Sequence, residues 1–218
     1  KYLSQIAIVK TVGGVMFPNH PLAATKDELM KLKGYNTDIE ASRKEAIKLL
    51  KDAGHSNLKV DFSNRGVDQP YKVVGTWLVD QWRKVGIETA QRVQPSGPFY
   101  DSLRKKADFD VSIDFNCQSV INPIADMTKF LGSAGNNYGR FEDPELEAIY
   151  SKIEKEGDAT KLRQLVRQYE TRSLSDETSG MVTLWWYKIN PHRSYVKGWK
   201  IAPSHYLAQH LDHIWLDK

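Results

Sequence analysis

Residues 58–115 read LKVDFSNRGVDQPYKVVGTWLVDQWRKVGIETAQRVQPSGPFYDSLRKKADFDVSIDF, and this stretch decides the fold class. Three segments alternate apolar and polar residues with the period of a half-buried strand; they are 58–64, 87–93 and 109–115. The segments between them have helical spacing; they are 69–86 and 98–106. Strands that alternate with helices of this length predict right-handed crossovers onto one sheet of an α/β protein.

The predicted helix 69–86 has one apolar face, which consists of Val73, Val74, Trp77, Leu78 and Val85, with Trp82 at its edge. Pro70 suits the first turn of this helix, and Gly86 suits its end. Ligands of such sheets bind outside the carboxyl ends of the strands. We therefore expect the functional chemistry directly after Phe115.

Helices are also expected on both sides of this unit. Residues 34–55 predict a helix in which Thr37 and Glu40 form a capping box, and its core face consists of Ile47, Leu50 and Ala53. Downstream, a short helix is expected from Pro123 to Leu131, and Asp143 and Asp158 each cap a further helix. The remaining predictions are a helix over 1–9, loops over 11–24 and 133–141, a strand over 181–189, and short strands and turns over 190–218.

The composition of the chain limits the classes of function that it can have. The chain has 218 residues, 40% of them hydrophobic and 27% charged, with a formal net charge of +4. The positive charge is dispersed, and no predicted helix combines a basic face with aromatic stacking residues, so a nucleic-acid partner is not expected. No apolar run reaches the roughly 18 residues of a membrane-spanning helix. Cys117 is the only cysteine, which excludes an internal disulfide.

Two features are typical of a ligand site. The loop after the third strand offers amide and hydroxyl groups from Asn116, Gln118, Ser119 and Asn122. Trp185 and Trp186 are adjacent on a strand, which sends their rings to opposite faces, so that one packs in the core and the other covers a ligand. Amide donors with an aromatic platform suit recognition of a polar ligand and supply no acid, base or nucleophile. The alternative is that both tryptophans belong to the core.

Catalytic and metal sites have weaker support. The tail histidines lack the spacing that places two rings on one helical face beside an acid; they are His192, His205, His210 and His213. A hydrolase using Cys117 or one of these histidines stays open as an alternative, as does a protein-interaction module using the tryptophan-rich tail. No motif of the nucleotide-binding or serine-hydrolase type is present, and Gly13–Gly14 is interpreted as an ordinary turn.

Several motifs, in this order, resemble those of the extracellular solute-binding proteins of dipeptide and oligopeptide (family 5) ABC transporters. They are A-x-x-L-L-x-x-A-G at 46–54, a variant of L-x-x-x-G-I at 82–87, and N-x-x-x-F-x-D-P-E-L-E at 137–147. The similarity runs over nearly the whole chain. It implies a periplasmic-binding-protein-like lobe with a mixed sheet and helices on both faces.

The resemblance also implies a domain organisation. Residues 1–189 would be the second ligand-binding lobe, and 190–218 a tail that returns to an absent first lobe. The helical pattern of 1–9 has no N-cap, which fits a chain cut from a longer one; the signal peptide and first lobe would then be absent. The parent protein is expected in the periplasm or outside the cell, with ABC permease subunits as partners.

The implied function is capture of a peptide or another small polar solute between two lobes, with no enzymatic activity, cofactor or metal. The peptide-binding members hold the ligand amine with an acidic residue in the stretch that matches 116–123, yet no Asp or Glu occurs from Phe115 to Ala125. Arg104 falls where such proteins can carry an arginine near the ligand. A neutral polar or anionic solute is therefore as admissible as a zwitterionic peptide.

Overall fold

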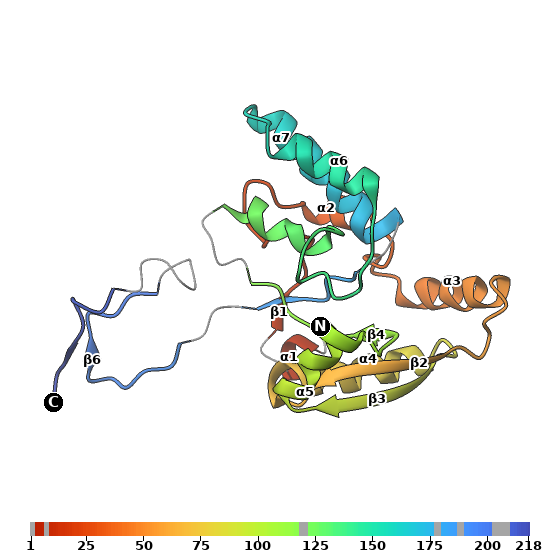
Figure 1. The fold of residues 1–218 in the computed structure, drawn as a ribbon, viewed down its shortest axis with the longest axis horizontal. Coiled ribbons are helices and arrows are strands. Elements are labelled where there is room, and N and C mark those ends of the chain that lie inside the picture. Colours follow the sequence, from red (N-terminus) through yellow and green to blue (C-terminus); the bar gives the residue numbers. More distant parts are fainter. Residues whose placement is uncertain (1–2, 7–8, 118–121, 177–179, 187–189, 202–209) are drawn as a thin grey trace.

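The computed structural model describes residues 3–6, 9–117, 122–176, 180–186, 190–201 and 210–218. Its elements form a sheet with covering helices, a helical subdomain on the opposite side of the ladder β1–β5, and a C-terminal tail set apart from both (Figure 1). Among the described residues, no helix has the length and apolar character needed to cross a membrane.

The three predicted strands form one sheet. Strand β2 (Lys59–Arg65) lies between β3 (Glu88–Gln94) and β4 (Val111–Ser112), and both pairings are parallel. The predicted crossover connections are therefore confirmed, and their right-handedness stays a prediction. Among the described residues this sheet is parallel, and the antiparallel pairs of the fold lie in two separate ladders, β1–β5 and β6–β7. Strand β4 is also shorter than the predicted 109–115.

Helices cover both faces of this sheet. The ring of Phe62 contacts Trp82 of helix α4 (Val73–Arg83) edge-on, with 5.3 Å between ring centroids. Arg65 points to the opposite face, where its Nε donates to Ser96 Oγ of helix α5 (Ser96–Asp101) at 2.9 Å. Helix α5 continues into the turn η2 (Ser102–Lys106). Trp82 thus belongs to the face that packs on the sheet rather than to its edge.

Helix α4 is shorter than predicted at its start. The turn η1 (Asp68–Lys72) precedes it, and Gln69 is extended with φ −113° and ψ 130°, so helical backbone is interrupted beside Pro70. Gly75 allows close packing on the sheet, because a Cβ there would lie 2.1 Å from Nδ2 of the buried Asn64. Periodicity in the sequence does not report such a contact.

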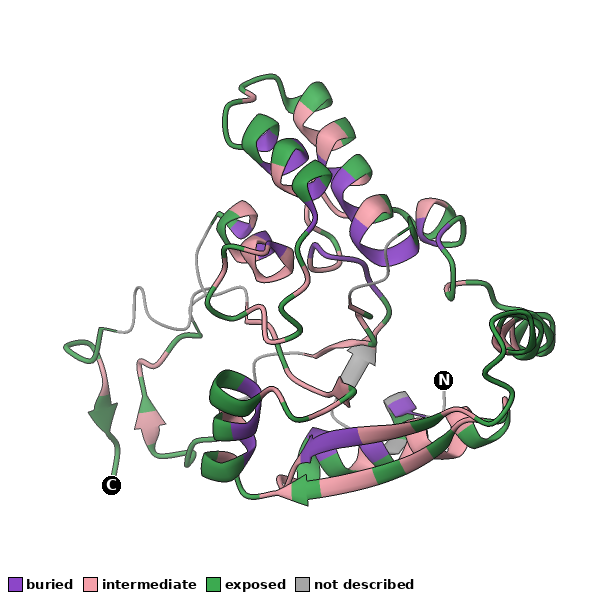
Figure 2. Ribbon diagram, turned by 45° about the vertical axis from the view of Figure 1, so that its right-hand side comes forward, coloured by how far each residue is buried: buried purple, intermediate pink, exposed green. Residues whose placement is uncertain are grey.

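The helical subdomain holds the larger core. It consists of α2 (Lys26–Leu29), η3 (Pro123–Phe130), α6 (Pro144–Ile153), α7 (Ala159–Thr171) and η4 (Arg172–Asp176). Leu146, Ile153, Val166 and Tyr169 are buried where α6 and α7 face each other (Figure 2). The predicted caps are confirmed, since the side chain of Asp143 accepts from Leu146 N at 3.3 Å and that of Asp158 from Lys161 N at 2.8 Å.

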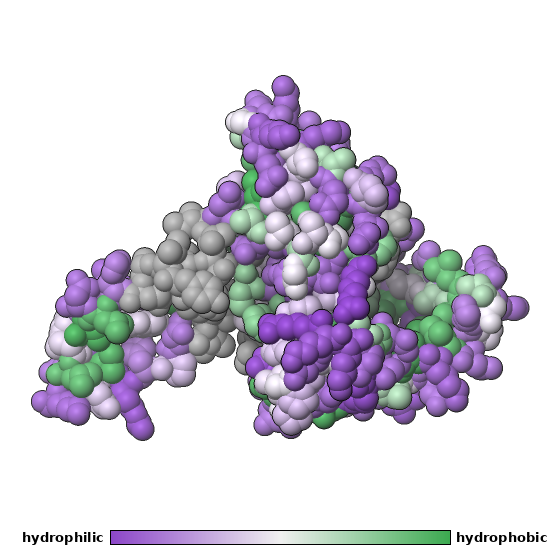
Figure 3. Space-filling model, viewed as in Figure 1, coloured by the Kyte–Doolittle hydropathy of each residue, from purple (hydrophilic) through white to green (hydrophobic). Residues whose placement is uncertain are grey.

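Helix α3 (Ile39–Asp52) forms as predicted but buries none of its residues. Its N-cap is Asp38 rather than Thr37, with Ala41 N donating to Asp38 Oδ1 at 3.0 Å. Ile47 is 47% exposed and Leu49 60%. They contribute to an apolar patch on this projecting helix (Figure 3). The expected core face of 34–55 is therefore wrong, because α3 lies beside the body of the molecule instead of on it.

Two short ladders complete the fold. Helix α1 (Leu3–Ile6) leads to β1 (Val9–Thr11), which pairs antiparallel with β5 (Trp185–Trp186). The predicted helix over 1–9 is thus too long, because Val9 already belongs to a strand. In the tail, β6 (Val196–Lys197) pairs with β7 (Trp215–Leu216), and Leu211, Trp215 and Leu216 are exposed.

Candidate ligand-binding site

A cavity of about 930 Å³ lies at the carboxyl end of β4, between the sheet and the helical subdomain. Ser112 to Cys117 line it from the sheet side, and Lys129, Phe130 and 136–139 line it from the helical side. The loop after β1 and the strand segment 180–186 close two further walls. This is the end of the sheet at which the topology predicts a ligand.

Aromatic side chains make up much of the wall. Trp185 and Trp186 both line the cavity and are both partly buried. Trp186 meets the ring of Tyr71 edge-on at 6.5 Å and packs against the small core of Leu3 and Val74. Trp185 meets Phe17 at 6.5 Å, and its Nε1 donates to Gly14 O at 3.0 Å. Each tryptophan therefore combines a packing contact with a place in the wall.

The predicted polar loop is only partly in the described structure. Asn116 lines the cavity, and its Nδ2 donates to Asp126 O at 3.0 Å, which ties the loop to η3. Asn122 does not line the cavity; its Oδ1 accepts from Ile124 N at 3.1 Å and caps η3. Gln118 and Ser119 lie outside the described residues.

Arg104 stands behind the wall rather than in it. Its guanidinium carbon lies 4.9 Å from the ring centroid of Tyr100, and its Nε donates to Tyr138 Oη at 3.4 Å. Tyr138 itself lines the cavity. Arg65 occupies a similar position, with its guanidinium carbon 5.2 Å from the ring of Tyr71. The tyrosine rings thus separate both cations from the cavity.

Sequence reasoning missed an ion pair in the lining. Lys129 Nζ lies 2.7 Å from Asp114 Oδ2, and the two side chains are only 20% and 12% exposed. Lys129 also donates to Phe115 O at 3.1 Å and lies 5.3 Å from the ring centroid of Tyr138. Asp114 directly precedes the stretch from Phe115 to Ala125 that lacks Asp and Glu, and alternation along 109–115 places it on the polar face.

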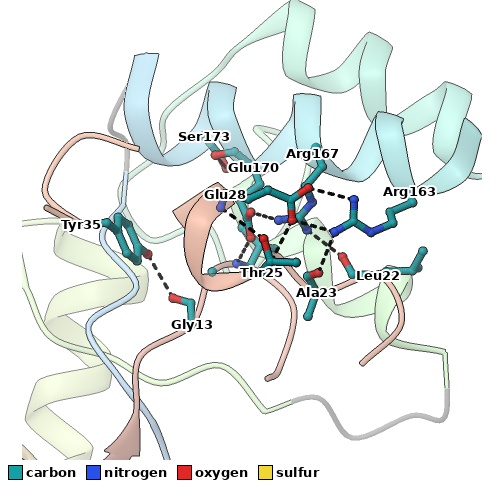
Figure 4. A network of polar contacts seen from close by, with 12 residues as sticks. Gly13, Leu22, Ala23, Thr25, Glu28, Tyr35, Arg163, Arg167, Glu170 and Ser173 are labelled. Atoms are coloured by element: carbon teal, nitrogen blue, oxygen red, sulfur yellow. Dashed lines mark hydrogen bonds and ion pairs between the residues drawn. The ribbon is translucent and has the colours of Figure 1, made fainter. Parts of the chain in front are cut away.

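A buried network supports the loop after β1 (Figure 4). Glu170 of α7 is 2% exposed, accepts from Val15 N at 2.7 Å through Oε1, and pairs with Arg167 through Oε2. Arg167 Nη2 donates to Leu22 O at 2.7 Å. Burial raises the pKa of Glu170, and the neighbouring guanidinium acts in the opposite direction. Helix α7 thereby holds both ends of this loop.

Gly14 is required by this network and is not an ordinary turn residue. A Cβ at Gly14 would lie 1.8 Å from Glu170 Oε1. At the preceding residue, Gly13 O accepts from Tyr35 Oη at 3.1 Å. The glycine pair therefore lets the backbone pass between α7 and Trp185. This passage places the loop after β1 in one wall of the cavity.

The described residues of this site offer little support for a catalytic nucleophile, a catalytic base or a metal site. Burial raises the pKa of the Cys117 thiol, which disfavours the thiolate that a nucleophile needs. Burial lowers the pKa of His20, and its Nδ1 accepts from Leu22 N at 3.1 Å; both effects favour the neutral ring. The described residues contain no cluster of three or more His, Cys, Asp or Glu that could hold a metal ion.

Comparison with solved structures identifies the architecture. DppA, the ABC-transporter-associated periplasmic binding protein of Helicobacter pylori, in complex with the peptide STSA, aligns over 100% of this chain with a TM-score of 0.77 and 16% identity. The fold is that of the ABC-transporter peptide-binding proteins. OppA of Haemophilus influenzae, in complex with RPPGFSPFR, aligns over 87% of the chain with a TM-score of 0.72 and 21% identity.

The murein tripeptide binding protein MppA of Escherichia coli shares this fold over 82% of the chain, with a TM-score of 0.65 and 15% identity. The chain spans 41% of DppA, 39% of OppA and 35% of MppA. No protein-family model and no curated protein sequence matches it. At these identities the likeness establishes the fold, and the neighbours are binding proteins rather than enzymes.

Proposed function

We propose that this chain is a ligand-binding lobe of an ABC importer's solute-binding protein and that it binds a peptide or another small polar solute without catalysis. The observation that carries the proposal is the 930 Å³ cavity, which has aromatic walls and lies at the carboxyl end of β4. Sites for small solutes combine such walls with a few polar groups. The shared architecture of DppA, OppA and MppA supports the same function.

In this proposal, Trp185 and Trp186 stack on the solute, and Asn116 with Gln118 and Ser119 supplies hydrogen bonds from the loop. Asn122, which was also predicted to bind the solute, instead holds the end of this loop by capping η3. Arg104 does not contact the solute in this proposal; it donates a hydrogen bond to Tyr138 and thereby holds that side chain in the cavity wall. The hydrolase alternative that uses Cys117 is weaker because burial raises the pKa of its thiol, which disfavours the reactive thiolate. Cys117→Ser should accordingly leave solute binding intact.

We further propose that residues 1–189 are the second lobe and that 190–218 complete a first lobe on a longer parent protein. The tail supports this division, since Leu211 and Trp215 are 72% and 58% exposed. Apolar side chains gather on the surface of the described tail, at the left of the view in Figure 3. Large exposed apolar groups are typical of an interaction surface. The parent protein would then work in the periplasm or outside the cell, and would deliver its solute to ABC permease subunits.

The test is a titration of the ¹⁵N-labelled chain with tetrapeptides at millimolar concentration, followed through the tryptophan indole N–H signals. Trp185→Phe and Trp186→Phe assign the two cavity signals, and Trp199 and Trp215 in the tail are internal controls. We expect only the cavity signals to shift, with affinity weaker than about 1 μM because one lobe covers one side of a ligand.

Shifts confined to Trp199 and Trp215 would instead support the protein-interaction alternative. A complete lack of shifts with tetrapeptides and with a neutral sugar would refute solute binding by this chain. Affinity tighter than about 1 μM would contradict the half-site interpretation.

A further inference from the structure

The described lining of the cavity contains two ionised side chains, Asp114 and Lys129, and they neutralise each other. Their 2.7 Å contact joins the end of β4 to η3, and both side chains are largely buried. Tyr138 covers the ammonium group at 5.3 Å from its ring centroid. The pair therefore brings opposite charges into the wall of the cavity without adding net charge to it.

The surroundings of the pair are neutral. Phe17, Tyr71, Phe115, Phe130, Trp185 and Trp186 contribute apolar surface to the described lining. Burial lowers the pKa of His20, and its Nδ1 accepts a backbone hydrogen bond from Leu22 N, which favours the neutral ring. The cations of Arg65 and Arg104 stand behind the rings of Tyr71 and Tyr138. A charged group that enters this cavity gives up its hydration and meets no free counter-ion among the described lining residues, which is costly in a partly dry environment.

We infer that the Asp114–Lys129 pair sets the charge selectivity of the cavity, which admits neutral, mainly apolar groups of a solute and rejects groups with a net charge. The inference rests on the proposed use of this cavity for solute binding. It narrows the solute class: the part that enters the cavity carries no charge, and any charged ends of the solute stay outside.

Removing either partner should reverse the selectivity in a defined direction. Asp114→Asn leaves the Lys129 ammonium without its partner, so the cavity should select anionic groups. Lys129→Met leaves the Asp114 carboxylate uncompensated, so the cavity should select cationic groups. Asp114 Oδ1 is already buried without a hydrogen-bond partner among the described residues, which makes this second change the larger disturbance. The double variant should be neutral again.

The experiment uses two probe series that differ only in charge. The first is benzyl alcohol, benzylammonium and benzoate. The second is the tripeptide Ala-Xaa-Ala with blocked ends, in which Xaa is Leu, Lys or Glu. Binding is followed through the indole signals of Trp185 and Trp186. The unmodified chain should bind the neutral member about tenfold more tightly than either charged member, and each single variant should gain about tenfold for one opposite charge.

Lys105→Met is the matched control, because it removes the same charge from an ion pair outside the cavity. Lys105 lies 2.8 Å from Asp101, and the two side chains are 75% and 55% exposed. This variant should keep the ranking of the unmodified chain. If it shifts selectivity as Lys129→Met does, net charge rather than the pair is responsible, and the inference fails.

The other outcomes are equally decisive. Equal binding of neutral and charged probes by the unmodified chain, or a shift in the same direction by both single variants, would overturn the inference. If Lys129→Met does not fold, the double variant Asp114→Asn/Lys129→Met is tested instead. It should rank the neutral and charged probes as the unmodified chain does, and a different ranking would refute the role of the pair. Ranked binding of the aromatic probes without any tripeptide binding would preserve the inference and refute only the peptide part of the proposed function. Failure of every probe to bind would overturn both.

Discussion

Helices α7 and α3 have similar sequence signals but differ in how far their apolar faces are buried. Each begins at an aspartate whose side chain accepts a backbone N–H, and each carries an amphipathic pattern. Val166 and Tyr169 of α7 are fully buried, whereas α3 buries none of its residues. Figure 2 shows the same contrast, with α7 packed on α6 and α3 standing at the side of the molecule. A local pattern thus predicts that a helix forms, while its packing partner decides whether the apolar face is buried.

The largest effect that would test this contrast is expected at Tyr169. Its ring is 0% exposed, and its hydroxyl donates to Met127 O at 2.7 Å. Tyr169→Ala should lower the free energy of unfolding by about 3–5 kcal/mol, as large-to-small changes in cores do. Urea denaturation followed by circular dichroism measures it. A loss below about 1 kcal/mol would mean that α6 and α7 do not share a packed core.

Asp143→Ala should come next, because Asp143 serves two elements. It caps α6 and accepts from Arg172 Nε at 2.7 Å while only 5% exposed. Its loss leaves a largely buried guanidinium without this partner and should cost about 3 kcal/mol. The matched control is Asp38→Ala at the exposed cap of α3, which should cost only about 1 kcal/mol. Equal costs would show that burial adds nothing to the cap of α6.

Gly14→Ala should disturb the loop that α7 supports. The new methyl group would meet Glu170 Oε1, so the backbone or α7 must shift, at a cost of about 1–3 kcal/mol. The indole signal of Trp185 should move as well, since its Nε1 donates to Gly14 O. Gly97→Ala, where a Cβ meets nothing within 4 Å, is the control and should move neither the unfolding free energy nor that signal.

Glu28 should give the helical subdomain a measurable acid dependence. Hydrogen bonds from Arg163 lower the pKa of Glu28 from 4.5 to about 2. The stabilisation is therefore present above pH 4.5 and is lost as the pH falls toward 2. Glu28→Gln should cost less than about 1 kcal/mol at pH 7, because the pair is partly exposed. The difference from the unmodified chain should vanish near pH 2, and a constant difference across this range would contradict the assignment.

The smallest effect is expected at Leu49 of α3. This side chain is 60% exposed, so Leu49→Ala removes little buried surface and should change the free energy of unfolding by less than about 0.5 kcal/mol. Urea denaturation at low protein concentration checks the value. A cost of about 2 kcal/mol would show that the apolar face of α3 is covered in solution.

The sequence by itself determined the local features of this protein. Strands β2 and β3 and the caps Asp143 and Asp158 were all predictable, because alternation and capping act between residues a few positions apart. Parallel pairing was predictable too, since a strand–helix–strand unit returns in the same direction. The same reasoning predicted a site after β4, and Asn116, Trp185 and Trp186 do line the cavity there. Their role in binding stays a prediction.

Only the tertiary structure decided what depends on distant partners. The Asp114–Lys129 pair spans 15 positions, and the bond from Val15 N to Glu170 spans 155. The need for glycine at Gly14 and Gly75 arises from side chains on other elements, and the exposure of α3 arises from the lack of a packed neighbour within the described chain. Neither periodicity nor capping encodes such contacts, because they form only when the chain folds and brings separate segments together.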